Sequence, residues 1–106
     1  GGRIIKDVRS LGGVHALHLW GCNKITDVSA LRGVHTLDLT YCTNVTDVSA
    51  LGRVYTLNLR ECINITNVST LSRVHTLNLK GCINITNESL GILNNVTNLT
   101  LPLPRY

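Results

Sequence analysis

The sequence contains no phenylalanine and no methionine among its 106 residues, and it has a single tryptophan. A hydrophobic core must therefore be built from leucine, valine, isoleucine, alanine and cysteine. Such a uniform set suits a stack of similar layers better than an irregular globule. No apolar run approaches the ~20 residues that span a bilayer, and no apolar stretch follows the N-terminal Gly1-Gly2-Arg3. We therefore expect neither a membrane span nor a signal peptide.

Concentrated charge and catalytic motifs are missing as well. The net charge is +4, but Lys and Arg are scattered, so we expect no nucleic-acid partner and no membrane partner. There is no serine in a nucleophile elbow, no glycine-rich phosphate loop and no pair of carboxylates on one face. His18 and Asp38 are expected to be neighbours on an open sheet, which cannot exclude water. We predict no enzymatic activity, no cofactor and no metal.

What the chain does contain is a repeat of 20 residues. Its four cysteines are spaced by that interval: Cys22, Cys42, Cys62 and Cys82. Complete units occupy residues 14–33, 34–53, 54–73 and 74–95, the last being two residues longer; a half repeat occupies residues 5–13 and a terminal strand residues 96–103. Because the repeat covers almost the whole chain, we predict a single domain over residues 1–106.

Each unit combines a strand pattern with a short return. The segment V-x-x-L-x-L alternates apolar and polar residues, which is typical of a strand. A 20-residue interval without a long helix predicts parallel neighbours joined by tight returns. In the return ITDVSAL, apolar Ile25, Val28 and Leu31 are three residues apart, which favours a turn or a piece of 3₁₀ helix. Capping of this turn is expected from Asp27, Asp47, Asn67 and Asn87.

The unit LxLxxC followed by xxITDVSAL resembles leucine-rich repeats, and its ITDVSAL half resembles the short bacterial internalin type. The tandem HTLDL…CxNVTDVSAL units also resemble short-repeat proteins of giant viruses that infect amoebae. The resemblance covers residues 5–103. It implies a mostly β, right-handed α/β-type solenoid with one parallel sheet of about five strands and short turn or 3₁₀ returns. The strands are expected to start near Val14, Val34, Val54, Val74 and Val96.

Equivalent residues of successive units should stack about 4.8 Å apart in columns. The inward columns are Val14/Val34/Val54/Val74/Val96, Leu17/Leu37/Leu57/Leu77/Leu99, Leu19/Leu39/Leu59/Leu79/Leu101, Ile25/Val45/Ile65/Ile85 and Val28/Val48/Val68. The last column breaks at Glu88. We therefore expect an altered return over residues 88–95, with a short helical turn whose Leu90, Ile92 and Leu93 cap the stack.

The cysteine column is expected to pack inside the core. Stacked cysteines project in parallel and do not converge as a zinc site requires. Their Cβ atoms would lie nearly 5 Å apart, beyond the roughly 3.5–4.5 Å of a disulfide. Metal binding and redox chemistry are the lesser alternatives. Four unpaired thiols predict an intracellular, non-secreted protein, in a host cell's cytoplasm or in a virion if the source is viral.

Three polar columns have both structural and functional interpretations. Asn44, Asn64 and Asn84, beside Thr26, Thr46, Thr66 and Thr86, are expected to hydrogen-bond the backbone of adjacent coils. Seven asparagines also begin N-x-S/T, so glycosylation is the alternative. His15, His35 and His75, with Tyr55 in the third unit, form a further column. Duplication explains this column, and a pH sensor or a ligand set is the alternative.

The outward face of the sheet is the usual binding surface of the family that the repeat resembles. Its most variable positions lie at the strand ends, where specificity can enter. Trp20 and Tyr41 are aromatic anchors of the kind that dominate protein interfaces. The candidate binding residues on this concave face are His18, Trp20, Asp38, Thr40, Tyr41, Arg60 and Lys80.

The N-terminal edge of the sheet is expected to be unpaired, because the half repeat lacks a preceding strand. A trimmed upstream cap is the competing explanation. Pro102 and Pro104 are expected to block the other edge. We therefore predict a homodimer or a higher even oligomer through the edge strand Val14, His15, Ala16, Leu17, His18, Leu19 and Trp20. The predicted function is a self-assembling scaffold; the alternative is an adaptor that binds a foreign protein, such as one from a host.

Overall fold

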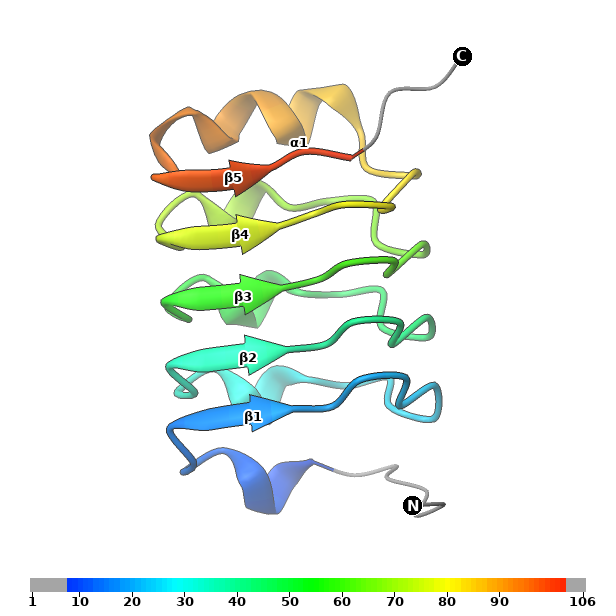
Figure 1. Ribbon diagram of the computed structural model, residues 1–106, viewed down its shortest axis with the longest axis vertical. Coiled ribbons are helices and arrows are strands. Elements are labelled where there is room, and N and C mark those ends of the chain that lie inside the picture. The colour runs from blue at the N-terminus through cyan, green and yellow to red at the C-terminus, as the bar shows by residue number, and fades with distance from the viewer. Residues whose placement is uncertain (1–7, 103–106) are drawn as a thin grey trace.

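The five V-x-x-L-x-L segments form the strands of one parallel sheet, in chain order. The computed structural model describes residues 8–102. The strands are β1 (Ala16–His18), β2 (Thr36–Asp38), β3 (Thr56–Asn58), β4 (Thr76–Asn78) and β5 (Asn98–Thr100). Leu17 pairs with Leu37 and Leu37 with Leu57, so each complete repeat makes one turn of the coil. Figure 1 shows the strands stacked with the returns behind them, rising as a right-handed solenoid.

The strands begin two residues later than the sequence predicts. His35 and Thr36 both donate their N–H groups to the carbonyl of His15, each at 3.0 Å, and regular pairing starts only there. The valines that precede β2, β3 and β4 are nevertheless buried, as their column predicts. The difference arises because the chain still turns toward the sheet at the valine, which packs inward before the ladder begins.

The returns are single 3₁₀ turns in the first coils: η1 (Arg9–Leu11), η2 (Ser29–Leu31), η3 (Ser49–Leu51) and η4 (Ser69–Leu71). The predicted capping is confirmed at three of them. The N–H groups of Ser29, Ser49 and Ser69 donate to the side-chain oxygens of Asp27, Asp47 and Asn67, each at 2.9 Å. Two hydrogen bonds from Ser49 hold the pKa of the Asp47 carboxyl below its ordinary value; the bond from the hydroxyl contributes more than the bond from the N–H. Each cap satisfies one N–H group that the short turn leaves free.

The longer fourth unit carries the predicted helical turn, as α1 (Asn87–Gly91) followed by η5 (Ile92–Asn95). The expected capping role of Asn87 is wrong. Asn87 is the first helical residue, and Thr86 is the N-cap because its hydroxyl accepts the N–H of Ser89 at 3.3 Å. Leu93 is buried and Leu90 packs partly against the core, as predicted, but Ile92 points to solvent.

The core is one continuous set of stacked apolar columns. All five predicted columns contribute, and a sixth, Leu31/Leu51/Leu71, is fully buried at the end of the 3₁₀ turns. The exceptions lie in the end coils, where a described neighbour exists on one side only. Val14 and Leu101 are exposed, and Leu17 and Leu99 are half-buried. Burial in this fold therefore depends on having a coil above and a coil below.

Side chains tie the coils together outside the sheet. Each inner cysteine donates its thiol to a leucine carbonyl of the preceding coil: Cys42 to Leu19 at 3.0 Å, Cys62 to Leu39 at 3.1 Å and Cys82 to Leu59 at 2.9 Å. All four cysteines are free thiols, and the inner three are buried. These contacts fit the predicted packing role. They also require the protonated thiol, because a thiolate has no hydrogen to donate.

The asparagine column acts in the same way at the surface. The side-chain amide of Asn44 donates to the carbonyl of Asn23, that of Asn64 to Thr43 at 2.6 Å and that of Asn84 to Ile63 at 2.7 Å. The same role predicted for the threonine column is wrong for residues 26, 46 and 66, because their exposed hydroxyls bond to no described residue. The amides are therefore the structural half of this pair of columns.

Candidate functional site

The two aromatic anchors lie together at the end of the first two strands. Trp20 follows β1 and is 66% exposed, and Tyr41 follows β2 and is 41% exposed. Their ring centroids are 5.5 Å apart at an interplanar angle of 70°, an edge-to-face contact. This geometry favours an ordered pair, since the edge of one ring meets the face of the other. We call this pair, with the neighbouring His18 and Asp38, the aromatic corner.

Asp38 is the fixed polar element of the aromatic corner. Its Oδ1 accepts two bonds from Thr40, from the N–H at 2.9 Å and from the hydroxyl at 2.5 Å. Its Oδ2 lies 3.6 Å from Nδ1 of His18, whose side chain is largely exposed. Thr40 is buried, so its predicted place among the contact residues is wrong. Its hydroxyl turns toward Asp38 and orients that carboxylate instead.

Arg60 and Lys80 follow the next two strands, β3 and β4, and lie further along the sheet. Their backbone N–H groups donate to the side-chain oxygens of Asn58 and Asn78, each at 2.9 Å, which repeats the turn that Asp38 makes with Thr40. The Arg60 side chain is exposed and that of Lys80 is half-buried. The structure thus brings Trp20, His18, Asp38 and Tyr41 into one corner and places the two cations apart from it.

The third residue after each of the first four strands adopts a left-handed backbone. Gly21 and Gly81 have φ of 71° and 79°, and Tyr41 and Glu61 have φ of 60° and 61°. This conformation costs a residue other than glycine about 1–2 kcal/mol, so two of the four coils carry strain that the glycine coils avoid. Strained residues often mark functional positions. The strain at Tyr41 therefore supports a role for its side chain, as its edge-to-face contact with Trp20 also does.

We expect Glu61→Gly to raise the free energy of unfolding by about 1 kcal/mol, because glycine adopts the left-handed backbone without a steric cost. Urea unfolding followed by circular dichroism measures the change. Gly81→Ala is the matched control and should destabilise by about 1–2 kcal/mol. Its Cβ would also meet the Glu61 carboxylate at 2.3–2.6 Å, so that flexible side chain must move. Destabilisation by Glu61→Gly would show that the Glu61 side chain contributes more than the strain costs.

A second ordered group of side chains is a column of stacked rings just before the strands. The ring of His35 stacks on those of His15 and Tyr55, with centroids 4.4 and 4.9 Å away, and His75 stacks on Tyr55 at 4.4 Å. Nδ1 of His35 and of His75 lies 3.0 and 2.9 Å from the hydroxyl of the following threonine. Since the rings contact one another face to face, the column stabilises the stack and leaves mainly ring edges for a ligand.

The outer edge of β1 has backbone groups that bond to no other described residue. Thr36 donates to the carbonyl of His15 at 3.0 Å and Leu19 to that of Asp38 at 2.8 Å, so these groups face β2. Alternation along a strand then directs the N–H and C=O groups of Ala16 and His18 away from β2. Among the described residues no strand pairs with this side. Of the predicted edge strand, residues 14–16, 18 and 20 are exposed, Leu17 is half-buried and Leu19 is buried.

The expected blocking of the opposite edge by Pro102 is not what the geometry shows. Pro102 corresponds to Thr40 and Lys80, whose N–H groups donate to the side chain two residues earlier and not to a neighbouring strand. Asn98 donates to His75 at 2.9 Å, so alternation turns the N–H groups of Leu99 and Leu101 outward. Proline removes a donor that the sheet does not use. Pro104 lies outside the described residues.

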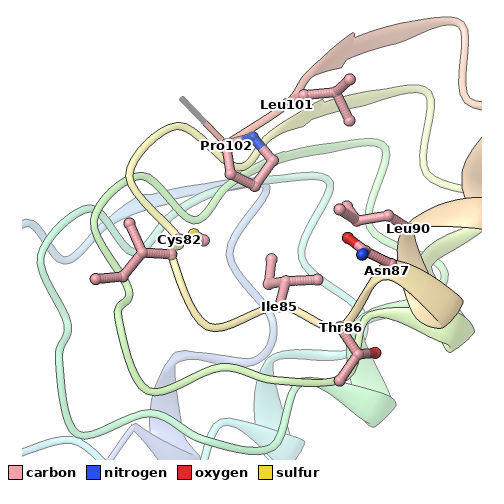
Figure 2. A pocket seen from close by; sticks show the side chains of 8 residues that line it. Cys82, Ile85, Thr86, Asn87, Leu90, Leu101 and Pro102 are labelled. Carbon is pink, nitrogen blue, oxygen red and sulfur yellow. The ribbon is translucent and has the colours of Figure 1, made fainter. Parts of the chain in front are cut away.

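A cavity of about 550 Å³ opens beneath the last coil. Figure 2 shows Leu101 and Pro102 on one side of the opening and Ile85, Asn87 and Leu90 on the other. In the inner coils the corresponding space is filled by the cysteine and the apolar residues of the following unit. This cavity is therefore the open end of the stacked core within the described part of the chain.

Two further observations concern residues 8–102 only. No group of three or more histidine, cysteine or acidic side chains lies close enough together to hold a metal ion. No helix in this range combines the length and the apolar character that crossing a membrane needs. Neither observation bears on the resemblance to giant-virus proteins, which stays a prediction.

Solved structures provide the comparison with known proteins. No protein-family model and no curated protein sequence matches the chain. The structure is similar to that of an internalin C2 from Listeria monocytogenes, with a TM-score of 0.60 and 28% identity over 89% of this chain. The chain spans 44% of that protein. A match to an internalin (inlF) of the same species, with 16% identity and a TM-score of 0.33, is too weak to add to it. The single parallel sheet, the short 3₁₀ returns and the internalin likeness together show a leucine-rich-repeat solenoid.

Proposed function

We propose that the chain is a non-enzymatic protein-interaction module whose contacts centre on the aromatic corner. The observation that carries this proposal is the exposed Trp20, which is ordered by its contact with Tyr41. Tyr41 keeps a strained backbone at a position where two of the other coils have glycine. Tryptophan and tyrosine are enriched among residues that dominate binding energy. The internalin-like architecture supports the same general role, since folds of this type are typically non-enzymatic and bind proteins.

We further propose that the first partner is a second copy of the chain. The N–H and C=O groups of Ala16 and His18 face outward, so two β1 strands related by a two-fold axis could pair antiparallel. This arrangement joins the two sheets into one and brings the two Trp20 side chains near the junction. The N–H groups of Leu99 and Leu101 also point outward, so β5 offers a second open edge. The test must therefore distinguish pairing through β1 from pairing through β5.

Light scattering coupled to size exclusion tests the pairing. We expect the unmodified protein to elute as a homodimer or a higher even oligomer and Ala16→Pro to shift it to monomer, because proline removes a donor that points away from β2. The control is Ala16→Thr, which retains the N–H and introduces the residue that β2, β3 and β4 carry at this position. An unmodified protein that is monomeric, or an oligomer that survives Ala16→Pro, would contradict β1 pairing.

The second candidate is an adaptor that binds a foreign protein on the sheet face. The exposure of Trp20, Tyr41 and Arg60 favours this role if the chain proves to be a monomer. Labelled protein captures partners from a cell extract, and Trp20→Ala should abolish the capture of those that use the aromatic corner. Lys80→Ala, further along the face, is the control. Partners that are retained equally by Trp20→Ala would place the binding surface elsewhere.

We also propose a reducing, intracellular location, in a host cell's cytoplasm or in a virion if the source is viral. The support is the use of three thiols as hydrogen-bond donors to the backbone of neighbouring coils. Oxidation would remove each donor and enlarge a side chain in a closely packed column. Antibody staining of the source cells tests the location, and detection in the medium would contradict it.

A further inference from the structure

One arginine of each inner coil lies just before a strand. These arginines are therefore on the side of the sheet where the strands begin, whereas the aromatic corner is on the side where they end. Arg32 follows η2 directly, and Arg53 and Arg73 follow η3 and η4 by two residues. All three are exposed. They are about one repeat apart in the sequence, where they form no run of charge. The solenoid gathers them along one edge because each repeat returns the chain to the same place.

Arg32 and Arg53 flank an open groove of about 820 Å³ between the segment that follows η2 and the η3 turn of the next coil. His35, Ser49 and Gly52 also line it, and no carboxylate does. Neither guanidinium makes a hydrogen bond or an ion pair with any described residue. An unpaired guanidinium offers a planar fork of N–H donors that matches a carboxylate. The groove is therefore equipped to bind an anion.

The surroundings distinguish between kinds of anion. The groove lies at the C-terminal ends of η2 and η3, which present carbonyl groups and no cluster of N–H donors for a single phosphate. The ring of His35 stacks on both of its neighbours, so its faces are not free to stack on nucleobases. Two flexible arginines on either side of an open channel suit a ligand whose charges are spaced along an extended chain.

We propose that this groove binds an acidic peptide segment of a protein partner, with its carboxylates paired to Arg32 and Arg53. The groove is separate from the aromatic corner and from the outer edge of β1. The module could therefore contact a partner both where the strands begin and where they end. This second contact goes beyond the function proposed above. Its test is independent, since neither arginine belongs to those surfaces.

The experiment measures the fluorescence anisotropy of a labelled peptide of alternating glutamate and glycine at low salt. We expect saturable binding that weakens as sodium chloride is raised, because exposed ion pairs are screened. Arg32→Gln combined with Arg53→Gln should lower the affinity about tenfold. The control, Lys24→Gln, removes an exposed cation that does not line the groove and should leave the affinity unchanged. Thermal unfolding confirms that each variant is folded.

Three results would overturn the proposal. The first is equal affinity of the folded double variant and the unmodified protein for the acidic peptide. The second is equal binding of a peptide in which glutamine replaces glutamate, which would show that charge is not recognised. The third is tighter binding of a single-stranded oligothymidylate of matched charge that the double variant abolishes. That result would assign the groove to nucleic acid.

Discussion

Leu59→Ala should lower the free energy of unfolding by about 2–5 kcal/mol, the range for a fully buried leucine replaced by alanine. Leu59 is 0% exposed and lies in the middle of its column, so a coil on either side packs against the cavity. Because each repeat contacts only its neighbours, a central defect weakens both halves of the stack. We expect Leu57→Ala to behave alike, since Leu57 is 1% exposed. Urea unfolding followed by circular dichroism gives the values.

Leu101→Ala is the matched control for this cavity. Leu101 belongs to the same column of the repeat but is 54% exposed, because no described coil covers it. The same substitution there should cost less than about 1 kcal/mol, since little packing is lost. Similar losses at the two positions would show that position in the repeat, and not burial between two coils, determines the energy.

The inner thiols should be almost inert in the folded protein and destabilising at alkaline pH. Burial raises the pKa of Cys42 and of Cys82 to about 11 from an ordinary value of 9.0, and raises that of Cys62 further. No described carbonyl of a preceding coil accepts a bond from Cys22, which is only half-buried. Its thiol lies 4.0 Å from the Trp20 carbonyl of its own coil. With an aromatic disulfide reagent we expect Cys22 to react first and the inner three roughly 100-fold more slowly.

The same pKa shifts set the direction of the pH dependence. A thiol whose pKa is raised by folding stays protonated while the unfolded chain loses its proton. Its contribution to stability is therefore complete below about pH 9 and is lost as the pH rises toward 11. Each inner thiol should lower the free energy of unfolding by about 1.4 kcal/mol per pH unit in this interval. Urea unfolding with a reductant at several pH values measures the slope.

A cysteine variant isolates the thiol contribution from that of other groups that titrate in alkali. Cys62→Ala removes one of the three buried thiols, so the slope attributable to thiols should fall by about one third. Equal slopes for the unmodified protein and Cys62→Ala would contradict the role of burial. Rapid reaction of all four thiols in the folded protein would contradict the packing of the column.

The repeat made much of the fold predictable from the sequence. Because residues 20 apart fall in the same column, one judgement about Leu37 applies to Leu57 and Leu77 as well, and all three are buried. The altered return was predictable because Glu88 cannot occupy the buried valine position. The repeat pattern does not show which members of a column lie in an end coil and are therefore exposed. Val14 and Leu101 match the repeat, but each lacks a described coil on one side, so their burial was predicted wrongly.

The candidate site was less predictable, since it depends on local backbone geometry. Thr40 shares a column with exposed Arg60, but its hydroxyl reaches the Asp38 carboxylate and the residue is buried. The strain at Tyr41 is a property of φ that residue type alone does not disclose. The blocking role expected of Pro102 failed for a similar reason, because the direction in which each N–H group points is set by the pairing of the strands.

By itself the sequence determined the number of coils, their register and the composition of the core, because a period of 20 residues and the alternation of apolar residues suffice for these. Only the tertiary structure decided which surfaces the coils create. Arg32 and Arg53 are distant in the sequence and flank one groove, and Trp20 meets Tyr41 one coil later. The physical reason is that burial and pairing are carried by the repeated residues, while each surface is assembled from non-repeated residues that stacking brings into contact.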